Sequence, residues 1–411
     1  MVLAIVFLTL LITNSRAQWT PLGGGLGGDI GVLTEINSNL YAGGTAHLFR
    51  STDNGDNWAG LMTQPAYAWS IAVSGSDLYC GLWSSYGMTA GVYRSTDNGI
   101  NWNITSLSGK VVYDLAATDQ QIVAIVNDYG ISKIYSTTNS GMNWANITGD
   151  LTYGIYRLAV SGNRIYAGSQ GLHVTTNNGA HWSPVFMTDN IDAVTTSGSI
   201  IFVGSTSHGV FRSTDYGQSW ENTLITDKRI YSIYMYGSNV FAGGDTCFYV
   251  STDGGSTFTD KMQGLGNATI SGIVVHNNYL YVVNSNYLST NIAGWKRYLP
   301  QLIGIKNISS EIPRDFNLYQ NYPNPFNPST KIKFSLPHPS EGGEQGVSLV
   351  IYDLLGRQVA SLIAPLWGGQ EGLQPGTYEV DWDAANYPSG VYFYTLSAGS
   401  YKQTKRMILL K

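Results

Sequence analysis

The chain has 411 residues, which is too long for one ordinary hydrophobic core, so we expect two or more domains. Only 12% of the residues are charged and 48 are glycine, a composition that fits neither disorder nor collagen. The net charge is −5 and no basic block occurs, so nucleic acid is not an expected partner. Two cysteines, Cys80 and Cys247, are too few for a disulfide scaffold, and we expect both to be free thiols.

The first 17 residues have the features of a signal peptide. Residues 2–12 are almost all apolar, but this run is too short to span a bilayer. Small residues at Ser15 and Ala17 predict cleavage before Gln18, although no Lys or Arg precedes the apolar run. The alternative for this segment is a buried strand. No other segment is apolar enough to cross a membrane, so no stable membrane span is expected.

One pattern, Ser/Thr-x-Asp/Asn-x-Gly-x-x-Trp, recurs along residues 18–304. Its central acidic or amide residues are separated by 44, 42, 38, 38, 38 and 38 positions, and the last copy is degraded. These residues are Asp53, Asp97, Asn139, Asn177, Asp215, Asp253 and Asn291. A period near 40, with short alternating strands and turn residues between them, predicts blades of four strands each. We therefore predict an all-β chain whose residues 18–304 form a seven-bladed β-propeller.

This motif resembles the Asp-box, also called the BNR repeat, of sialidases, sortilin-type receptors, photosystem assembly factors and some glucan hydrolases. In such a turn the carboxylate or amide accepts hydrogen bonds from nearby main-chain N–H groups. Glycine supplies the positive φ angle of a tight turn, and the Trp fills the wedge between blades. The seven Asp and Asn residues are therefore expected to be structural rather than catalytic.

The period ends near residue 302, where a linker over 305–315 is predicted. Strand patterns follow at 331–335, 347–352, 376–382, 390–396 and 402–410. Together they predict a small immunoglobulin-like β-sandwich of about seven strands over 316–411.

This C-terminal segment resembles the sorting domain of the type IX (Por) secretion system. The resemblance rests on Asn-Tyr-Pro-Asn-Pro-Phe-Asn-Pro-Ser-Thr at 321–330, Tyr-Asp-Leu-Leu-Gly at 352–356, Ser-Gly-Val-Tyr at 389–392 and the basic and apolar end at 405–411. It implies the type IX machinery as a partner, and a secreted or outer-membrane surface location. A generic sandwich or carbohydrate-binding module is the alternative.

Propellers bind ligands where loops surround the central channel, and the repeated motif occupies only one of its two faces. Alignment of the repeats puts another set of residues at the start of the inner strands, on the opposite face. The ligand-binding candidates there are Trp69, Tyr113, Tyr156, Arg157, Arg229 and Tyr231, with Asp114, Asp192 and Gly272 at similar positions. Loops between the second and third strands add His47, Tyr86, Asp128, Tyr129, His208 and Asp245.

Catalytic signatures are few in this sequence. The Arg-Ile-Pro signature of sialidases is missing, and the six histidines lack metal-ligand spacing, so neither a metal nor another cofactor is expected. Glycoside hydrolysis needs two positioned carboxylates, for which Asp114 and Asp192 are the candidates.

Three functions remain open. The leading hypothesis is a binding protein for a polymer, such as a glycan, or for a protein ligand. One alternative is a polysaccharide-active hydrolase or lyase, and the other is an assembly or receptor-like scaffold. The fold by itself does not choose among them.

Overall fold

The structure is a computed structural model of the 411-residue chain. It describes residues 18–411 except 46, 63–66, 84–88, 119, 152–153, 224, 310, 339–346, 364–372, 374 and 385–386. The predicted signal peptide, 1–17, and Tyr86 lie outside the described residues.

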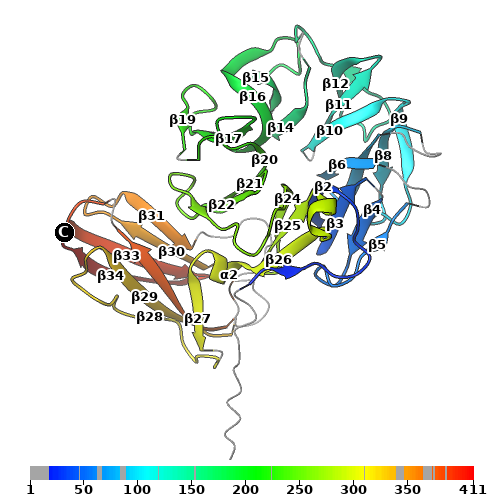
Figure 1. The fold of residues 1–411 in the computed structure, drawn as a ribbon. Helices are drawn as coiled ribbons and strands as arrows, with labels where there is room; N and C mark the ends of the chain where they lie inside the picture. The colour runs from blue at the N-terminus through cyan, green and yellow to red at the C-terminus, as the bar shows by residue number, and fades with distance from the viewer. Residues whose placement is uncertain are drawn as a thin grey trace, which may run out of the picture.

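The larger domain is a seven-bladed β-propeller whose antiparallel blades surround a central channel (Figure 1). Three separate four-stranded sheets begin the ring. Blade 1 contains β2 (Ile30–Ile36), β3 (Asn39–Gly44), β4 (Leu48–Ser51) and β5 (Ala59–Gly60). Blade 2 contains β6 (Tyr67–Ser74), β7 (Asp77–Trp83), β8 (Gly91–Ser95) and β9 (Asn103–Ser108). Blade 3 contains β10 (Val111–Ala117), β11 (Ile122–Asp128), β12 (Ile131–Thr137) and β13 (Ala145–Asn146).

Blades 4 and 5 form one six-stranded sheet, because two of its strands, β15 (Arg164–Thr175) and β16 (Ser183–Ser197), are each long enough to occupy two successive strand positions. The six strands are β14 (Arg157–Ser161), β15, β16, β17 (Ile200–Ser205), β18 (Val210–Ser213) and β19 (Glu221–Asn222). The first half of β16 pairs with β15 and its second half pairs with β17, so β16 is the outer strand of blade 4 and the inner strand of blade 5. Blade 6 contains β20 (Ile230–Tyr236), β21 (Asn239–Gly244), β22 (Cys247–Ser251) and β23 (Thr259–Asp260).

The two ends of the propeller sequence meet in blade 7. This sheet joins β24 (Ile270–His276), β25 (Tyr279–Asn284) and β26 (Gly294–Tyr298) to β1 (Thr20–Pro21). Thr20 pairs with Lys296, and the neighbouring Trp19 is buried with its ring 5.4 Å from that of Phe248. The N-terminal strand therefore closes the ring as the outermost strand of the last blade.

The core of the propeller consists of strands that are covered on both faces. In β11, for example, Ile122, Val123, Ala124, Ile125 and Val126 are all buried. Such continuous apolar runs are expected where a strand has a neighbouring sheet on each side. Cys80 and Cys247 lie in this packing as free, buried thiols.

Six copies of the repeated motif form the same turn between the third and fourth strands of blades 1 to 6, and we call these the Asp turns. In each, the Ser or Thr hydroxyl donates to the Asp or Asn side chain at 2.7–2.9 Å and accepts from the Gly N–H at 2.8–3.1 Å. The seventh copy differs, because Asn291 ends the short helix α1 (Tyr287–Thr290) and donates its N–H to the carbonyl of Tyr287. The shorter sequence of this copy thus adopts a helical turn.

The C-terminal domain is a sandwich of two four-stranded antiparallel sheets. One contains β27 (Ile305–Ser309), β32 (Gly376–Asp383), β29 (Ser329–Leu336) and β28 (Asn317–Leu318). The other contains β31 (Gln358–Ile363), β30 (Val347–Tyr352), β33 (Gly390–Ala398) and β34 (Tyr401–Leu409). A buried cluster that includes Phe334, Tyr378 and Tyr394 fills the space between the sheets. The predicted all-β fold, a seven-bladed propeller followed by a small sandwich, is confirmed.

The segment predicted to be a linker, 305–315, begins with a strand instead. Residues 305–309 form β27, which pairs with β32, and Ile305 is buried in the sandwich core. The preceding short helix α2 (Leu299–Leu302) belongs to the propeller, since Leu299 and Leu302 lie in its core. Between them, Ile303 packs against both cores. Only about two residues therefore separate the two domains.

Candidate functional site

The inner strands of the propeller share one irregularity that points a side chain toward the channel. The register of β2, β6, β10, β16, β20 and β24 shifts near the start of the strand that lines the channel, leaving one residue without a partner. A β-bulge of this kind bends the strand and re-aims the extra side chain. The bulge residues are Gly31, Trp69, Tyr113, Asp192, Tyr231 and Ser271. Tyr156, which precedes β14 and donates its N–H to Gly168, occupies the same place in blade 4.

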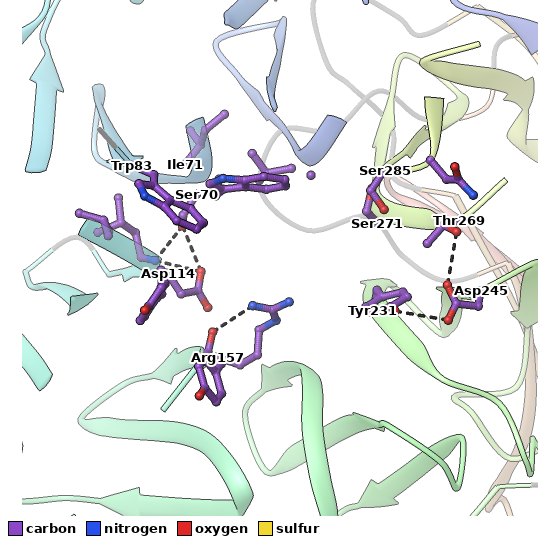
Figure 2. A pocket seen from close by; sticks show the side chains of 18 residues that line it. Ser70, Ile71, Trp83, Asp114, Arg157, Tyr231, Asp245, Thr269, Ser271 and Ser285 are labelled. Carbon is purple, nitrogen blue, oxygen red and sulfur yellow. Dashed lines mark hydrogen bonds between the residues drawn. The ribbon is translucent and has the colours of Figure 1, made fainter. Parts of the chain in front are cut away.

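A cavity of about 700 Å³ lies at this end of the channel (Figure 2). Six predicted residues line it together: Trp69, Tyr113, Asp114, Tyr156, Arg157 and Tyr231. Arg157 and Asp114 form one side, and Tyr231, Asp245 and Thr269 face them across the opening. The Asp turns follow the far ends of the third strands, so the cavity and the Asp turns lie on opposite faces of the propeller. Its volume is in the range of sites that hold small ligands, about 300–1,000 Å³.

The position of the Trp69 ring requires a glycine, Gly31, at the equivalent position of the neighbouring blade. A Cβ atom on Gly31 would lie 2.4 Å from Cε3 of the Trp69 ring, which is closer than real Cβ contacts allow. Blade 1 thus has no side chain at its bulge, and the indole from blade 2 uses that space. The Trp69 Nε1 atom is buried and has no hydrogen-bond partner among the described residues.

Two tyrosines form a second aromatic element of the cavity wall. The rings of Tyr113 and Tyr156 lie 5.9 Å apart at an angle of 56°. The hydroxyl of Tyr113 accepts a hydrogen bond from Asn127 at 2.8 Å, which holds its ring in place. Tyr156 is 52% exposed, so its ring is accessible to a ligand in the cavity.

Asp114 joins three blades through its carboxylate. It accepts hydrogen bonds from Ser70 Oγ at 3.0 Å, from its neighbour Leu115 N at 2.9 Å and from Leu158 N at 2.8 Å. Burial raises the pKa of this carboxyl group, while Arg157 and the hydrogen bonds oppose that effect. Because both oxygens have partners inside the protein, the carboxylate acts first as a clamp between blades 2, 3 and 4.

Asp192 belongs to a different network. Its carboxylate receives Arg229 Nε at 2.7 Å and the hydroxyl of Thr206 at 3.2 Å. The same guanidinium lies 4.7 Å from the centre of the Tyr231 ring. The hydrogen bond with Asp192 raises the pKa of Arg229. Neither Asp192 nor Arg229 lines the cavity, so the two predicted carboxylates, Asp114 and Asp192, are held in separate networks.

Arg157 is the cation that faces the cavity. Its Nε donates to the main-chain carbonyl of Asp192 at 2.5 Å, and Nη1 donates to the carbonyl of Tyr156 at 3.0 Å. In the part of the chain that the structure describes, no carboxylate forms an ion pair with Arg157. The guanidinium is therefore held in position by two main-chain carbonyls, and its positive charge can interact with a hydrogen-bond acceptor in the cavity.

Asp245, named from the sequence as a loop residue of this face, also lines the cavity and accepts hydrogen bonds from the hydroxyls of Tyr231 and Thr269, each at 3.3 Å. Sequence reasoning missed other polar residues of the wall. Ser271, rather than the predicted Gly272, is the bulge residue of blade 7 and lines the cavity. The repeat alignment could have found Ser271, since it matches Trp69 and Tyr231 in position. Ser70 and Trp83 carried no such signal.

Among the described residues, no group of three or more His, Cys, Asp or Glu side chains is arranged to hold a metal ion. No helix in that part of the chain is long and apolar enough to cross a membrane.

Comparison with protein families identifies the C-terminal domain. The family described as a secretion system C-terminal sorting domain matches residues 320–410. The chain thus ends in a type IX secretion sorting domain, which implies contact with the secretion machinery and a secreted or cell-surface location. No curated protein sequence matches the chain.

Three solved structures resemble the chain in fold. YCF48, solved bound to a D1 peptide, aligns over 68% of this chain and 94% of its own length, with 15% identity and a TM-score of 0.55. PorZ, a surface component of the type IX secretion system of Porphyromonas gingivalis, aligns over 95% of this chain and 61% of its own, with 15% identity and a TM-score of 0.53. The GH74 enzyme of Niastella koreensis aligns over 94% of this chain and 67% of its own length, with 13% identity and a TM-score of 0.53. At these identities the similarity shows the fold alone.

This chain is therefore an exported β-propeller protein with a type IX sorting domain.

Proposed function

We propose that the propeller binds a glycan in the cavity opposite the Asp turns. The observation that carries this proposal is a cavity of about 700 Å³ whose wall combines Trp69, Trp83, Tyr113, Tyr156 and Tyr231 with the guanidinium of Arg157. Flat aromatic rings stack on the C–H faces of sugars, and a few oriented polar groups then select among their hydroxyls. The carboxylate of Asp245 and the cation of Arg157 supply such groups.

The proposal includes the route by which the protein reaches its ligand. Residues 1–17 act as a signal peptide for the inner membrane, and the sorting domain then directs the chain through the type IX machinery. The Asp turns, as members of the Asp-box type, serve the fold and leave the opposite face for binding. The resulting location outside the cell is where polysaccharides are encountered.

Two other functions remain as alternatives. A protein ligand, and with it the scaffold hypothesis, is favoured by the YCF48 structure, in which a propeller of this fold is bound to a peptide. A hydrolase is favoured by the GH74 neighbour, but here Asp114 has partners on both oxygens and Asp192 is paired with Arg229. Hydrolysis would require one of these carboxylates to leave its network.

The test is a glycan array and polysaccharide pull-down with the purified protein, followed by product analysis of every hit. We expect binding without release of sugars. Replacing Tyr156 by Ala, or Gly31 by Val, should weaken binding, because the first removes a stacking ring and the second displaces Trp69 without deleting any aromatic group. Tyr216→Asn is the matched control, since Tyr216 lies in an Asp turn where other copies have Asn.

Each outcome bears on one alternative. Released sugars that disappear in Asp114→Asn would replace the binding proposal with the hydrolase. Equal loss of binding in Tyr216→Asn and Tyr156→Ala would place the ligand elsewhere. The lack of any glycan hit would contradict the proposal and favour a protein ligand.

A further inference from the structure

A second hollow lies directly beside the central cavity, between blades 3 and 4. Its volume is about 650 Å³, and it shares Tyr113 and Tyr156 with the central cavity. From these two rings it extends outward along β12 and the segment that follows β13, past Ser132, Lys133, Asn146 and Thr148. We call this hollow the outer groove. The tyrosine pair is thus the common wall of two spaces of similar size.

The outer groove exists because β12 is longer than the strand beside it. β12 has seven residues, whereas β13 has two and pairs only with Tyr135 and Ser136. The polar main-chain atoms of Ile134 are still satisfied, because its carbonyl accepts from Ile147 N at 2.9 Å and its N–H donates to Thr148 Oγ1 at 2.9 Å. In an antiparallel strand, main-chain groups point to the same side at every second residue. The N–H and carbonyl of Ser132 therefore point the same way as those of Ile134, and no strand in the described part of the chain pairs with them there.

The lining of the outer groove consists mostly of uncharged residues. Lys133 is its one charged residue, and the Nζ atom of Lys133 lies 3.0 Å from the carboxylate of Asp128, which also pairs with Lys110. The remaining polar groups are hydroxyls, amides and main-chain atoms, including those of Ser132, Asn146 and Thr148. Such a lining suits a ligand with many neutral hydroxyl groups better than one with fixed charges, because it contains no unpaired ion to match.

We infer that the central cavity and the outer groove form one elongated site that holds a linear glycan across the Tyr113–Tyr156 pair. Some sugar units lie in the channel mouth, and the following units lie along the edge of β12. This inference rests on the proposed glycan function of the central cavity and adds the shape and direction of the ligand. It predicts that affinity depends on chain length, because a short oligosaccharide fills only one of the two spaces.

The experiment measures calorimetric affinity of the purified protein for linear β-1,4-linked oligomers of glucose, N-acetylglucosamine, xylose and mannose, in a ladder from dimers to octamers. For at least one sugar we expect affinity to rise about tenfold or more along the ladder and then level off. Ser132→Trp, which fills the outer groove, should leave the shortest bound oligomers unaffected and abolish the gain from length. Ser183→Trp, on the outer strand of blade 4, is the matched control and should keep the gain.

The outcomes separate the inference from the proposal beneath it. If the ladder binds with one affinity at every length, or if Ser132→Trp weakens all lengths equally, the elongated site is wrong while glycan binding in the cavity stands. If no oligomer of these four sugars binds, the elongated site for such a linear glycan is wrong, and both proposals are wrong if the glycan array gives no hit either. Ile131→Trp serves as a second blocking variant should Ser132→Trp fail to fold, since Ile131 lines the same groove and is 63% exposed.

Discussion

The two faces of the propeller differ in how much they vary from blade to blade. On one face, six Asp turns repeat the same hydrogen bonds with nearly the same distances, whether the central residue is Asp or Asn. On the other face, one bulge recurs in six blades with a varied residue: Gly31, Trp69, Tyr113, Asp192, Tyr231 and Ser271, and Tyr156 takes the same place in blade 4 without a bulge. A repeated backbone feature with varied side chains is suited to recognition of a ligand, whereas a repeated feature with repeated side chains serves the fold.

The two faces also differ in whether their polar groups have hydrogen-bond partners within the protein. In each Asp turn, the Ser or Thr hydroxyl and the Asp or Asn side-chain oxygen have hydrogen-bond partners within the turn itself. At the cavity, Trp69 Nε1 has no partner among the described residues and Arg157 is bonded only to carbonyls. Substitutions on the two faces should therefore have opposite consequences for stability and for binding.

The largest effect on stability is expected from a tryptophan on the Asp-turn face. Trp182 is 3% exposed, and its Nε1 donates to the carbonyl of Ile147 at 3.1 Å across the boundary of blades 3 and 4. Trp182→Ala should lower the free energy of unfolding by about 3–5 kcal/mol, because it leaves a cavity between blades. Urea unfolding of the variant measures this loss. A stability equal to that of the unmodified protein would contradict the structural role of this face.

A smaller loss is expected from the hydroxyl group of one Asp turn. Ser213 is buried, donates to Asp215 at 2.8 Å and accepts from Gly217 N at 2.8 Å. Ser213→Ala leaves that N–H without a partner, which should cost about 1–3 kcal/mol of unfolding free energy. Ser183→Ala, at an exposed position, is the control and should change stability by less than about 0.5 kcal/mol. Glycan affinity should be unchanged in both variants.

On the cavity face the pattern should be reversed. Tyr156→Ala should reduce glycan affinity about tenfold, which is equivalent to about 1.4 kcal/mol of binding free energy. Its effect on unfolding should be within about 0.5 kcal/mol, because half of the side chain is already exposed. Calorimetric titration and urea unfolding of the same sample compare the two quantities. A large loss of stability with unchanged affinity would make Tyr156 a packing residue.

The smallest expected effect concerns how the stability of the fold changes with pH, which should differ between carboxylates on the two faces. Hydrogen bonds from Asn57 and Ser219 lower the pKa of Asp53 and Asp215 to about 2. These groups stabilise the fold above their unfolded pKa, near 3.8, and this contribution is lost as the pH falls toward 2. Asp215→Asn should therefore show a smaller fall in unfolding temperature between pH 4 and pH 2.

The contribution of Asp114 to stability should change with pH in the opposite direction. Burial raises its pKa in the folded protein, so stability from this group is greatest at acid pH and falls as the pH rises above 3.8 toward its folded value. Unfolding temperatures of Asp114→Asn and the unmodified protein, compared from pH 4 to pH 7, measure this contribution. A difference between them that stays constant over the whole range would contradict it.

Much of the arrangement of the two faces could be predicted from the sequence, because the motif recurs at a regular spacing. The positions of the Asp turns and the start of each inner strand follow from the period, which is why six candidate residues meet in one cavity. The bulges could not be predicted, since a bulge depends on the register against the neighbouring strand. The same dependence on a distant strand explains why residues 305–309, predicted as part of a linker, instead form β27 through pairing with β32.

The contacts between distant segments were also beyond the sequence. Nothing local to Trp69 indicates that it needs the space left by Gly31, which lies in another blade. Asp114 and Asp192 have the same residue type at similar repeat positions, but their partners, Leu158 N and Arg229, separate them into a clamp and an ion pair. The outer groove likewise depends on the short length of β13, which alternation of apolar residues does not determine.

The most direct test of the central claim is amide hydrogen exchange of the purified protein with and without a glycan that binds in the array. We expect slower exchange at the start of the inner strands, around Ser70, Leu115, Leu158 and Ser232, and along β12 at Ser132 when the oligomer is long enough. Exchange at Gly55, Gly99 and Gly217 in the Asp turns should not change. Protection confined to the Asp turns, with no change around the cavity, would contradict the assignment of the binding face.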